Sequence, residues 1–197
     1  MMNKQGEKNK KCNISVSETA NLPTTHGEFL IQSFKENDKE HLVIYTKEIS
    51  DIVNVRIHSE CLTGDAIGSI KCDCQAQLNF ALDFINENGG MVIYLRQEGR
   101  NIGLLNKVNA YALQDKGFDT VEANHQLGFA DDERTYEIVD FIFEKFDIKK
   151  INLITNNPKK VENVNVEIVK RIPVIAGHNP KNANYLKIKK DKMGHIL

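Results

Sequence analysis

The sequence predicts an α/β fold: a single layered α/β/α domain around a mixed β-sheet, with an early antiparallel hairpin. Strand-like apolar segments alternate with helix-like segments along most of the chain, as in layered α/β domains. The first two strand-like segments are separated only by a polar turn, which is typical of a hairpin. The length of 197 residues suits one domain with a substantial core.

Composition narrows the class of protein. Hydrophobic residues make up 41% of the chain and the formal net charge is −1, so we expect a globular protein without the basic surface of a nucleic-acid binder. No apolar run approaches the roughly 18 residues that span a bilayer. No apolar segment follows the Lys-rich start, as it would in a secretory signal. We therefore expect a cytoplasmic protein that binds neither nucleic acid nor membrane.

The chain begins with a polar leader. Residues 1–21 are rich in Lys, Asn, Ser and Glu and contain few large apolar side chains. We expect this leader to be disordered, and the folded domain to span residues 22–197.

The first half of the domain supplies the hairpin and a helix. A helix is expected from an N-cap at Asp73, because apolar residues recur at helical spacing from Leu78 to Ile85 before Gly89 and Gly90. Residues 66–71 are expected to be extended. Apolar runs between polar turns predict strands at 28–34, 41–46, 51–58 and 91–95.

The second half continues the alternation. A polar loop is expected at 96–103, a helix at 104–116, and a functional loop at 120–132, where no periodicity is clear. A strongly amphipathic helix is expected at 133–146. The remaining elements are strands at 151–155 and 166–170, a short helix opened by Asn157-Pro158, and a polar tail at 176–197.

Three cysteines form the first candidate site. Residues two apart in an extended chain project to the same side, so Cys72 and Cys74 can face one metal ion. Cys61 can supply a third ligand from the end of the preceding strand. Three protein ligands leave the fourth tetrahedral position to water, the arrangement of a catalytic zinc, which lowers the pKa of that water to about 7.

Spacing alone leaves two other interpretations open. A structural zinc site would be completed by a histidine such as His58, and the thiols could also be buried without metal. Disulfides are less expected, because clustered cysteines in a cytosolic chain more often bind metal or do chemistry. We interpret Cys12, in the polar leader, as a bystander.

Three polar segments indicate an anion-binding cleft. The loop Arg96–Arg100 follows a strand end, where α/β sheets present ligands. At Thr155–Lys160 a strand end meets a helix start, and free backbone N–H groups with two lysines suit a phosphate. Asp131–Arg134 could bind a divalent ion or provide a general base beside a phosphate-facing arginine.

Each of these segments also has a simpler interpretation: a solvated loop, ordinary helix capping, or charges that favour a helix start. Taken together with the cysteines, they suggest a metal-activated water and a polyphosphate site in one cleft. That combination indicates hydrolysis at a nucleotide rather than a binding module.

Longer motifs identify a family. The segments Arg56–Asp65, Cys72–Cys74 and Arg96–Lys107 resemble GTP cyclohydrolase II. The resemblance runs from about residue 22 to the C-terminus, which is then one catalytic domain. It extends over the further motifs Asn109–Gln114, Asn124–Phe129, Asp132–Arg134, Thr155–Lys160 and Lys192–His195.

The resemblance implies the first committed step of riboflavin biosynthesis. GTP would lose C8 of its guanine as formate and also lose pyrophosphate, giving 2,5-diamino-6-(5-phosphoribosylamino)pyrimidin-4-one. Members of the family use zinc, one ion per subunit, and Mg²⁺ with the triphosphate, and they are typically homodimers. By this resemblance Cys61, Cys72 and Cys74 hold the zinc whose water attacks C8.

The resemblance also assigns the other site residues. Tyr111 assists ring opening or formate release, Asp132 accepts a proton, and Arg134 attacks the α-phosphorus. A guanidinium has a pKa above about 12 and no free lone pair, so we expect Arg134 to stabilise phosphate charge instead. The GTP contacts implied are Arg56, Ile57, His58, Ser59, Glu60, Gln77, Glu98, Gly99, Arg100, Thr120, Thr155 and Lys160.

Two rival functions stay open. A related enzyme could open the imidazole ring but retain the formyl group, and Tyr111 argues against it if this tyrosine serves deformylation. A structural-zinc binding module would instead unfold when the metal is removed.

Overall fold

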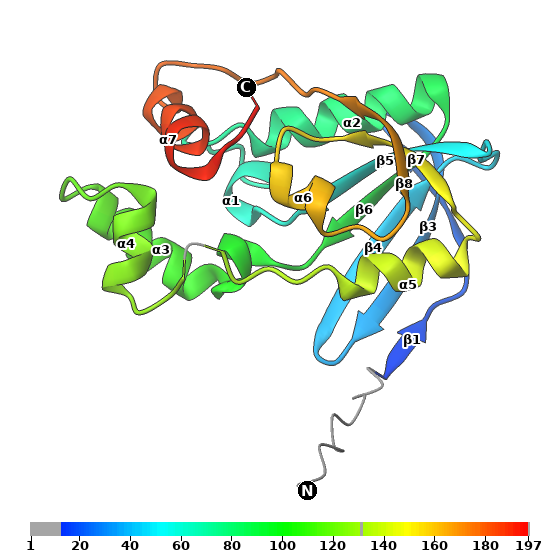
Figure 1. Ribbon diagram of the computed structural model, residues 1–197, viewed down its shortest axis with the longest axis horizontal. Helices are drawn as coiled ribbons and strands as arrows, with labels where there is room; N and C mark the ends of the chain where they lie inside the picture. Colours follow the sequence, from blue (N-terminus) through cyan, green and yellow to red (C-terminus); the bar gives the residue numbers. More distant parts are fainter. Residues whose placement is uncertain (1–12, 131, 197) are drawn as a thin grey trace, which may run out of the picture.

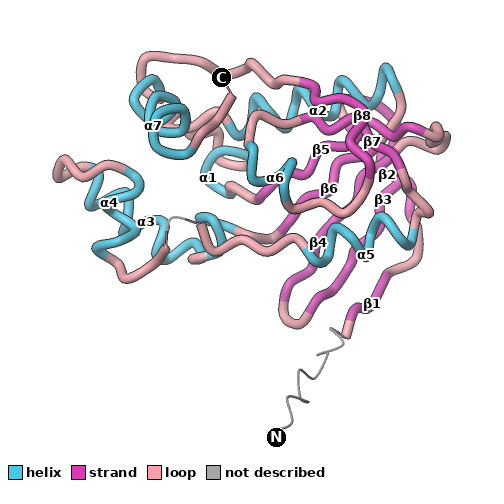
Figure 2. Tube along the Cα trace, viewed as in Figure 1, coloured by secondary structure: helices cyan, strands magenta, loops and turns pink. Residues whose placement is uncertain are grey.

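A mixed β-sheet runs through the middle of the protein, with helices on both of its faces (Figures 1 and 2). The computed structural model describes residues 13–130 and 132–196. Within these residues the sheet has eight strands in the order β1-β3-β4-β6-β5-β7-β8, and β2 also pairs with β3. The strands are β1 (Ile14–Val16), β2 (Ala20–Thr24), β3 (Gly27–Glu36), β4 (Lys39–Tyr45), β5 (Ile52–Ser59), β6 (Met91–Leu95), β7 (Lys150–Ile154) and β8 (Glu167–Ile172).

The sheet is antiparallel on one side and parallel on the other. β3 and β4 form the predicted early hairpin, and β4 pairs antiparallel with β6. β6, β5, β7 and β8 then run parallel to one another. The helices are α1 (Leu62–Asp65), α2 (Cys74–Asn88), the 3₁₀ helix η1 (Glu98–Asn101), α3 (Gly103–Gln114), α4 (Thr120–Gln126), α5 (Glu137–Lys145), α6 (Pro158–Glu162) and α7 (Ala183–Met193).

Two apolar layers fix α2 and α5 on opposite faces of the sheet. The predicted apolar face of α5, within Ile138–Phe143, packs against Val55 and Ile93. The apolar face of α2, within Ala81–Ile85, packs with Val92. Successive strand residues point to opposite faces, so Val92 and Ile93 enter different layers. The α/β fold class, with its layered arrangement and mixed sheet, is therefore confirmed.

The expectation of a disordered leader is wrong for its last part. β1 and β2 begin before residue 22 and pair end to end along one edge of β3, Ile14 opposite Glu36 and Ala20 opposite Ile31. Backbone pairing orders this segment, and polar composition does not reveal such pairing. Residues 1–12, with Cys12, lie outside the described residues.

The functional loop expected at 120–132 is wrong for its first half, which forms α4. A capping box begins this helix: Val121 N and Glu122 N donate to Asp119 Oδ1 (2.8 and 3.0 Å), and Asp119 N donates to Glu122 Oε2 (2.9 Å). The helix is short and mostly polar, so its periodicity is weak in the sequence. Asp131 lies outside the described residues.

Two further segments differ from expectation. Residues 66–71 form turns after the short helix α1 and are not extended. The polar tail contains α7, which buries Leu186 and Lys189. A buried lysine in place of an apolar residue conceals the helical pattern of α7.

The parallel strands position the site. The segments that follow β5, β6 and β7 leave the carboxyl ends of adjacent strands, the place where α/β sheets bind ligands. α1, α6 and α7 lie at this end of the molecule in Figure 1. Among the helices described, none is long and apolar enough to cross a membrane.

Candidate functional site

A cavity of about 340 Å³ opens at the carboxyl ends of β5, β6 and β7, a volume suited to a small molecule. Every residue that the family resemblance assigns to the site lines this cavity except two. Ile57 is fully buried in β5, and its carbonyl oxygen accepts a hydrogen bond from Lys160 Nζ (2.6 Å). Asp132 does not line the cavity but accepts a hydrogen bond directly from Arg134, which does.

The three cysteines converge on one wall of the cavity. Their sulfur atoms all lie within 4.8 Å of one another, and Cys61 Sγ is 3.6 Å from Cys72 Sγ. Gly64 makes this possible, since a Cβ at that position would lie 2.8 Å from Cys72 Sγ and 3.1 Å from Cys61 Sγ. The chain thus keeps a side chain out of the space between the thiols.

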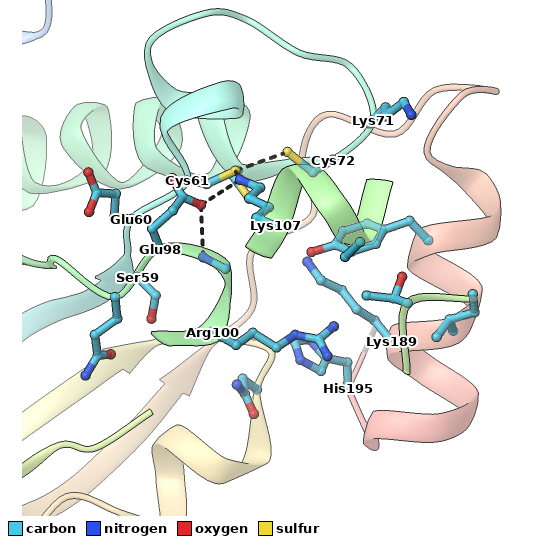
Figure 3. A pocket seen from close by; sticks show the side chains of 18 of the residues that line it. Ser59, Glu60, Cys61, Lys71, Cys72, Glu98, Arg100, Lys107, Lys189 and His195 are labelled. Atoms are coloured by element: carbon cyan, nitrogen blue, oxygen red, sulfur yellow. Dashed lines mark hydrogen bonds and ion pairs between the residues drawn. The ribbon is translucent and has the colours of Figure 1, made fainter. Parts of the chain in front are cut away.

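The surroundings of Cys61 favour negative charge. Lys107 Nζ donates to Cys61 Sγ (3.1 Å) and to Glu98 Oε1 (2.7 Å), as Figure 3 shows. Hydrogen bonds from Cys72 and Cys74, with the Lys107 ammonium, hold the pKa of Cys61 far below its usual value. The same shared bonds raise the pKa of Cys72 to about 11 and raise that of Cys74. Three close sulfurs with one stabilised thiolate fit a thiophilic ion such as zinc.

His58 is engaged elsewhere and does not join the three thiols. Its Nε2 lies 3.2 Å from Asp65 Oδ1, and its Nδ1 lies 3.4 Å from Arg56 NH2. Burial lowers the pKa of His58 to about 4, so the ring is neutral at pH 7. Asp65 also accepts from Tyr94 OH (2.8 Å) and from Cys61 N (2.9 Å). This network fixes the end of β5. Among the described residues, the candidate metal site therefore has three protein ligands, the three cysteines.

Cationic side chains also gather at the cavity. Arg56 is buried and donates to Ile154 O (3.1 Å) and to Gln77 Oε1 (2.6 Å). Its Nε has no hydrogen-bond partner among the described residues. Arg134 donates to Ser59 Oγ (3.3 Å), and Lys160, from α6, is almost fully buried.

Each of these cations disfavours the positive charge of its neighbours. Burial, with Arg56, Arg134 and Lys189 nearby, holds the pKa of Lys160 well below its usual value. Burial and the charges of Lys189, Arg134 and Lys160 lower the pKa of His195 to about 3. A region that disfavours its own positive charges is suited to a polyanion.

Asp132 holds the guanidinium of Arg134. Its Oδ2 is 2.6 Å from Arg134 NH2 and its Oδ1 is 2.8 Å from Arg134 Nε. Burial opposes ionisation of the carboxyl, but the hydrogen bond and charge of Arg134 lower the pKa of Asp132. The two groups form a bidentate ion pair, which fixes the plane of the guanidinium.

Tyr111 lies beside the thiols. Its hydroxyl is 3.2 Å from Thr63 Oγ1, which in turn lies 3.8 Å from Cys61 Sγ. Burial raises the pKa of Tyr111, so the hydroxyl remains a proton donor at pH 7.

The structure adds site residues to which the sequence assigned no role. Lys107 touches Cys61, and Tyr185, Lys189 and His195 reach the cavity from the C-terminal segment (Figure 3 for Lys107, Lys189 and His195). Lys107 and His195 lie in two of the motifs that carry the family resemblance, but no role was assigned to either of them. Tyr185 and Lys189 had no such signal, since no helix was predicted there.

Comparison with known proteins gives a consistent result. The family model of GTP cyclohydrolase II matches residues 15–173. The GTP cyclohydrolase-2 of Campylobacter hominis is 63% identical over 186 residues, which cover 94% of this chain and 96% of that protein. That of Campylobacter fetus subsp. fetus is 64% identical over 188 residues, covering 93% and 96%. That of Helicobacter pylori (strain Shi470) is 56% identical over 189 residues, covering 93% and 98%.

Proposed function

Because the chain belongs to the GTP cyclohydrolase II family, we propose that it hydrolyses GTP with release of formate and pyrophosphate. The product would be 2,5-diamino-6-(5-phosphoribosylamino)pyrimidin-4-one, in the first committed step of riboflavin biosynthesis. The observation that carries this proposal is one cavity lined both by a cluster of three thiols and by a group of buried cations. Such a cavity suits a substrate with a ring to hydrolyse and a polyphosphate to bind.

Cys61, Cys72 and Cys74 would hold one zinc ion per subunit. When bound there, zinc would supply a water of lowered pKa for hydrolysis at C8 of the guanine. The supporting observations are the three convergent sulfurs, the stabilised thiolate at Cys61 and the space kept open by Gly64. Lys107 offsets part of the negative charge of the cluster.

The triphosphate would lie against Arg134 and Lys160. Burial and repulsion from neighbouring cations lower the pKa of Lys160, and negative charge from the substrate would relieve that repulsion. We expect Mg²⁺ to accompany the triphosphate, as it does for most nucleotide substrates. Arg100, Thr120 and Thr155 also line the cavity and are proposed as GTP contacts.

Arg134 would act as a fixed cation and not as a nucleophile. Burial opposes its charge, but hydrogen bonding to Asp132 raises the pKa of Arg134, so the guanidinium carries no free lone pair. It would stabilise charge as the α–β phosphate bond breaks. Asp132 does not line the cavity, and we assign it to holding Arg134 in place of direct proton acceptance.

Tyr111 would serve the ring-opening side. Its raised pKa keeps the hydroxyl protonated, and it lies on the thiol wall beside Thr63. It can therefore donate a hydrogen bond to the formyl group as it leaves. This supports full release of formate over a reaction that stops at the formylated pyrimidine.

We also expect a cytoplasmic homodimer. Leu104, Leu105 and Val108 on α3 are exposed apolar side chains, 40%, 76% and 51% accessible, and a second subunit would cover such a surface.

The test is incubation of the purified protein with GTP and Mg²⁺, with formate and pyrophosphate measured in the same sample. The proposal predicts equal amounts of both. A formamidopyrimidine without free formate would favour the formyl-retaining rival, and no turnover at all would favour a binding module.

A further inference from the structure

The C-terminal segment packs on the loop that carries Cys72 and on the start of α2, where Cys74 lies. Asn182 Nδ2 donates to Cys72 O (3.3 Å), and Asn179 Nδ2 donates to Ile70 O (3.3 Å). Gly177 has a φ of +71°, and a Cβ there would lie 2.7 Å from Ala76 Cβ. Residues 177–182 therefore pack directly on the start of α2.

Lys189 makes the buried contact of this arrangement. Its Nζ lies 2.9 Å from Asp73 Oδ1, and the two side chains are 11% and 2% exposed. The ammonium also lies 4.4 Å from the centre of the Tyr185 ring. A buried ion pair of this kind is held in one geometry, because losing either partner leaves a charge without compensation.

From Asp73 the network continues to the cavity. Gln77 Nε2 donates to Asp73 Oδ2, and Gln77 Oε1 accepts from Arg56 NH2 (2.6 Å). Both the nitrogen and the oxygen of the Gln77 amide therefore have a hydrogen-bond partner, and these two bonds fix the orientation of the amide. Gln77 and Arg56 both line the cavity, and Gln77 follows Cys74 by one turn of α2.

We propose that Lys189 is a positioning residue for substrate recognition, acting through Asp73 on the Gln77 amide and on Arg56. This inference rests on the proposed function, since it takes GTP as the ligand that Gln77 and Arg56 meet. Without Lys189, Asp73 would compete for other donors and the amide would lose its fixed orientation. A misoriented amide would weaken the binding of GTP in the ground state and in the transition state by the same amount, so KM rises while kcat changes little.

The test is Lys189→Met in the full-length holoenzyme. KM for GTP should rise about tenfold, the order expected for one hydrogen bond to a charged group, with kcat within about twofold. Lys189→Arg should restore most of the native KM. Lys190→Met, an exposed neighbour on α7, is the matched control and should match the native enzyme. A merely structural role would lower kcat through loss of folded enzyme and leave KM unchanged, which would overturn the proposal.

A double-mutant cycle tests the route. In a Gln77→Ala background, Lys189→Met should raise KM no further, because the group that it orients is gone. Independent, multiplying effects of the two substitutions on KM would contradict the proposal.

If Lys189→Met does not fold, Asp73→Asn with Lys189→Met removes both buried charges and should show the same rise in KM. A native enzyme that releases no formate from GTP refutes the proposed function, whereas native turnover with unchanged KM in the variants refutes this inference alone.

Discussion

The two walls of the cavity carry their charges in opposite ways. The thiol wall comes from one local stretch, Cys61–Cys74, and Lys107 offsets only part of its negative charge, because this lysine also pairs with Glu98. The cationic wall is assembled from Arg56, Arg134 and Lys160, far apart in the sequence, and the charge on Lys160 is opposed by burial and by its cationic neighbours. A cluster that keeps excess negative charge suits a metal cation, and a cluster of buried cations is completed by an anionic substrate. We therefore propose that the thiol wall binds the metal and that the cationic wall binds the substrate.

The largest effect is expected on the thiol wall. Cys72→Ser should lower formate release on the order of 10³-fold or more, because the third thiolate of the metal site is lost. Pyrophosphate release and the fold should persist, since the cationic wall is untouched. Formate, pyrophosphate and the circular dichroism spectrum should be measured together, with Cys12→Ser as the control. A variant that is unfolded as purified would favour a structural role for the metal.

The next largest effect is expected on the cationic wall. Arg134→Met should lower pyrophosphate release on the order of 10²–10³-fold, the usual consequence of removing a group that stabilises transition-state charge. Bound zinc should remain at the native level. Mass spectrometry of the intact protein during turnover should detect no nucleotide attached to Arg134. Such an adduct would show that the guanidinium is a nucleophile and would refute the charge-stabilising role.

A smaller effect tests whether the cationic wall costs stability. Burial and neighbouring cations lower the pKa of Lys160 below 10.5 in the folded state. Its protonated form therefore opposes folding at neutral pH, and that penalty fades as the pH rises from the lowered pKa towards 10.5.

Lys160→Met should consequently raise the melting temperature of the ligand-free protein at pH 7 by roughly 2–4 °C, or about 1 kcal/mol. It should also raise KM for GTP, and its stability should no longer increase between neutral and alkaline pH through this group. Lys170→Met, exposed on β8, is the control. A lower melting temperature in the Lys160 variant would mean that the hydrogen bond to Ile57 O outweighs the charge penalty.

Local patterns predicted most of the fold, and pairing between distant segments accounts for what they missed. Alternating strands and the apolar face of α5 were legible because burial imposes a period on one segment. β1 and β2 were missed because what orders them is the free edge of β3, which their own composition does not report. α7 was missed because its buried positions include Lys189, whose partner Asp73 lies on another element.

The same distinction holds in the site. The convergence of Cys61, Cys72 and Cys74 was predicted from spacing, and it is present in the structure. The salt bridge that holds Arg134 was hidden, although Asp132 is only two residues away, because both were assigned separate catalytic roles. The contact of Lys107 with Cys61 depends on how α3 packs, and no local pattern encodes it.

Metal removal tests most directly whether the thiol wall serves formate release while the cationic wall serves pyrophosphate release. The protein should be dialysed against a chelator until zinc analysis finds none, and then given GTP with Mg²⁺ while formate, pyrophosphate and secondary structure are followed. We predict that formate release stops, pyrophosphate release continues, the fold persists, and added zinc restores formate. Formate production by the zinc-free protein would contradict the account.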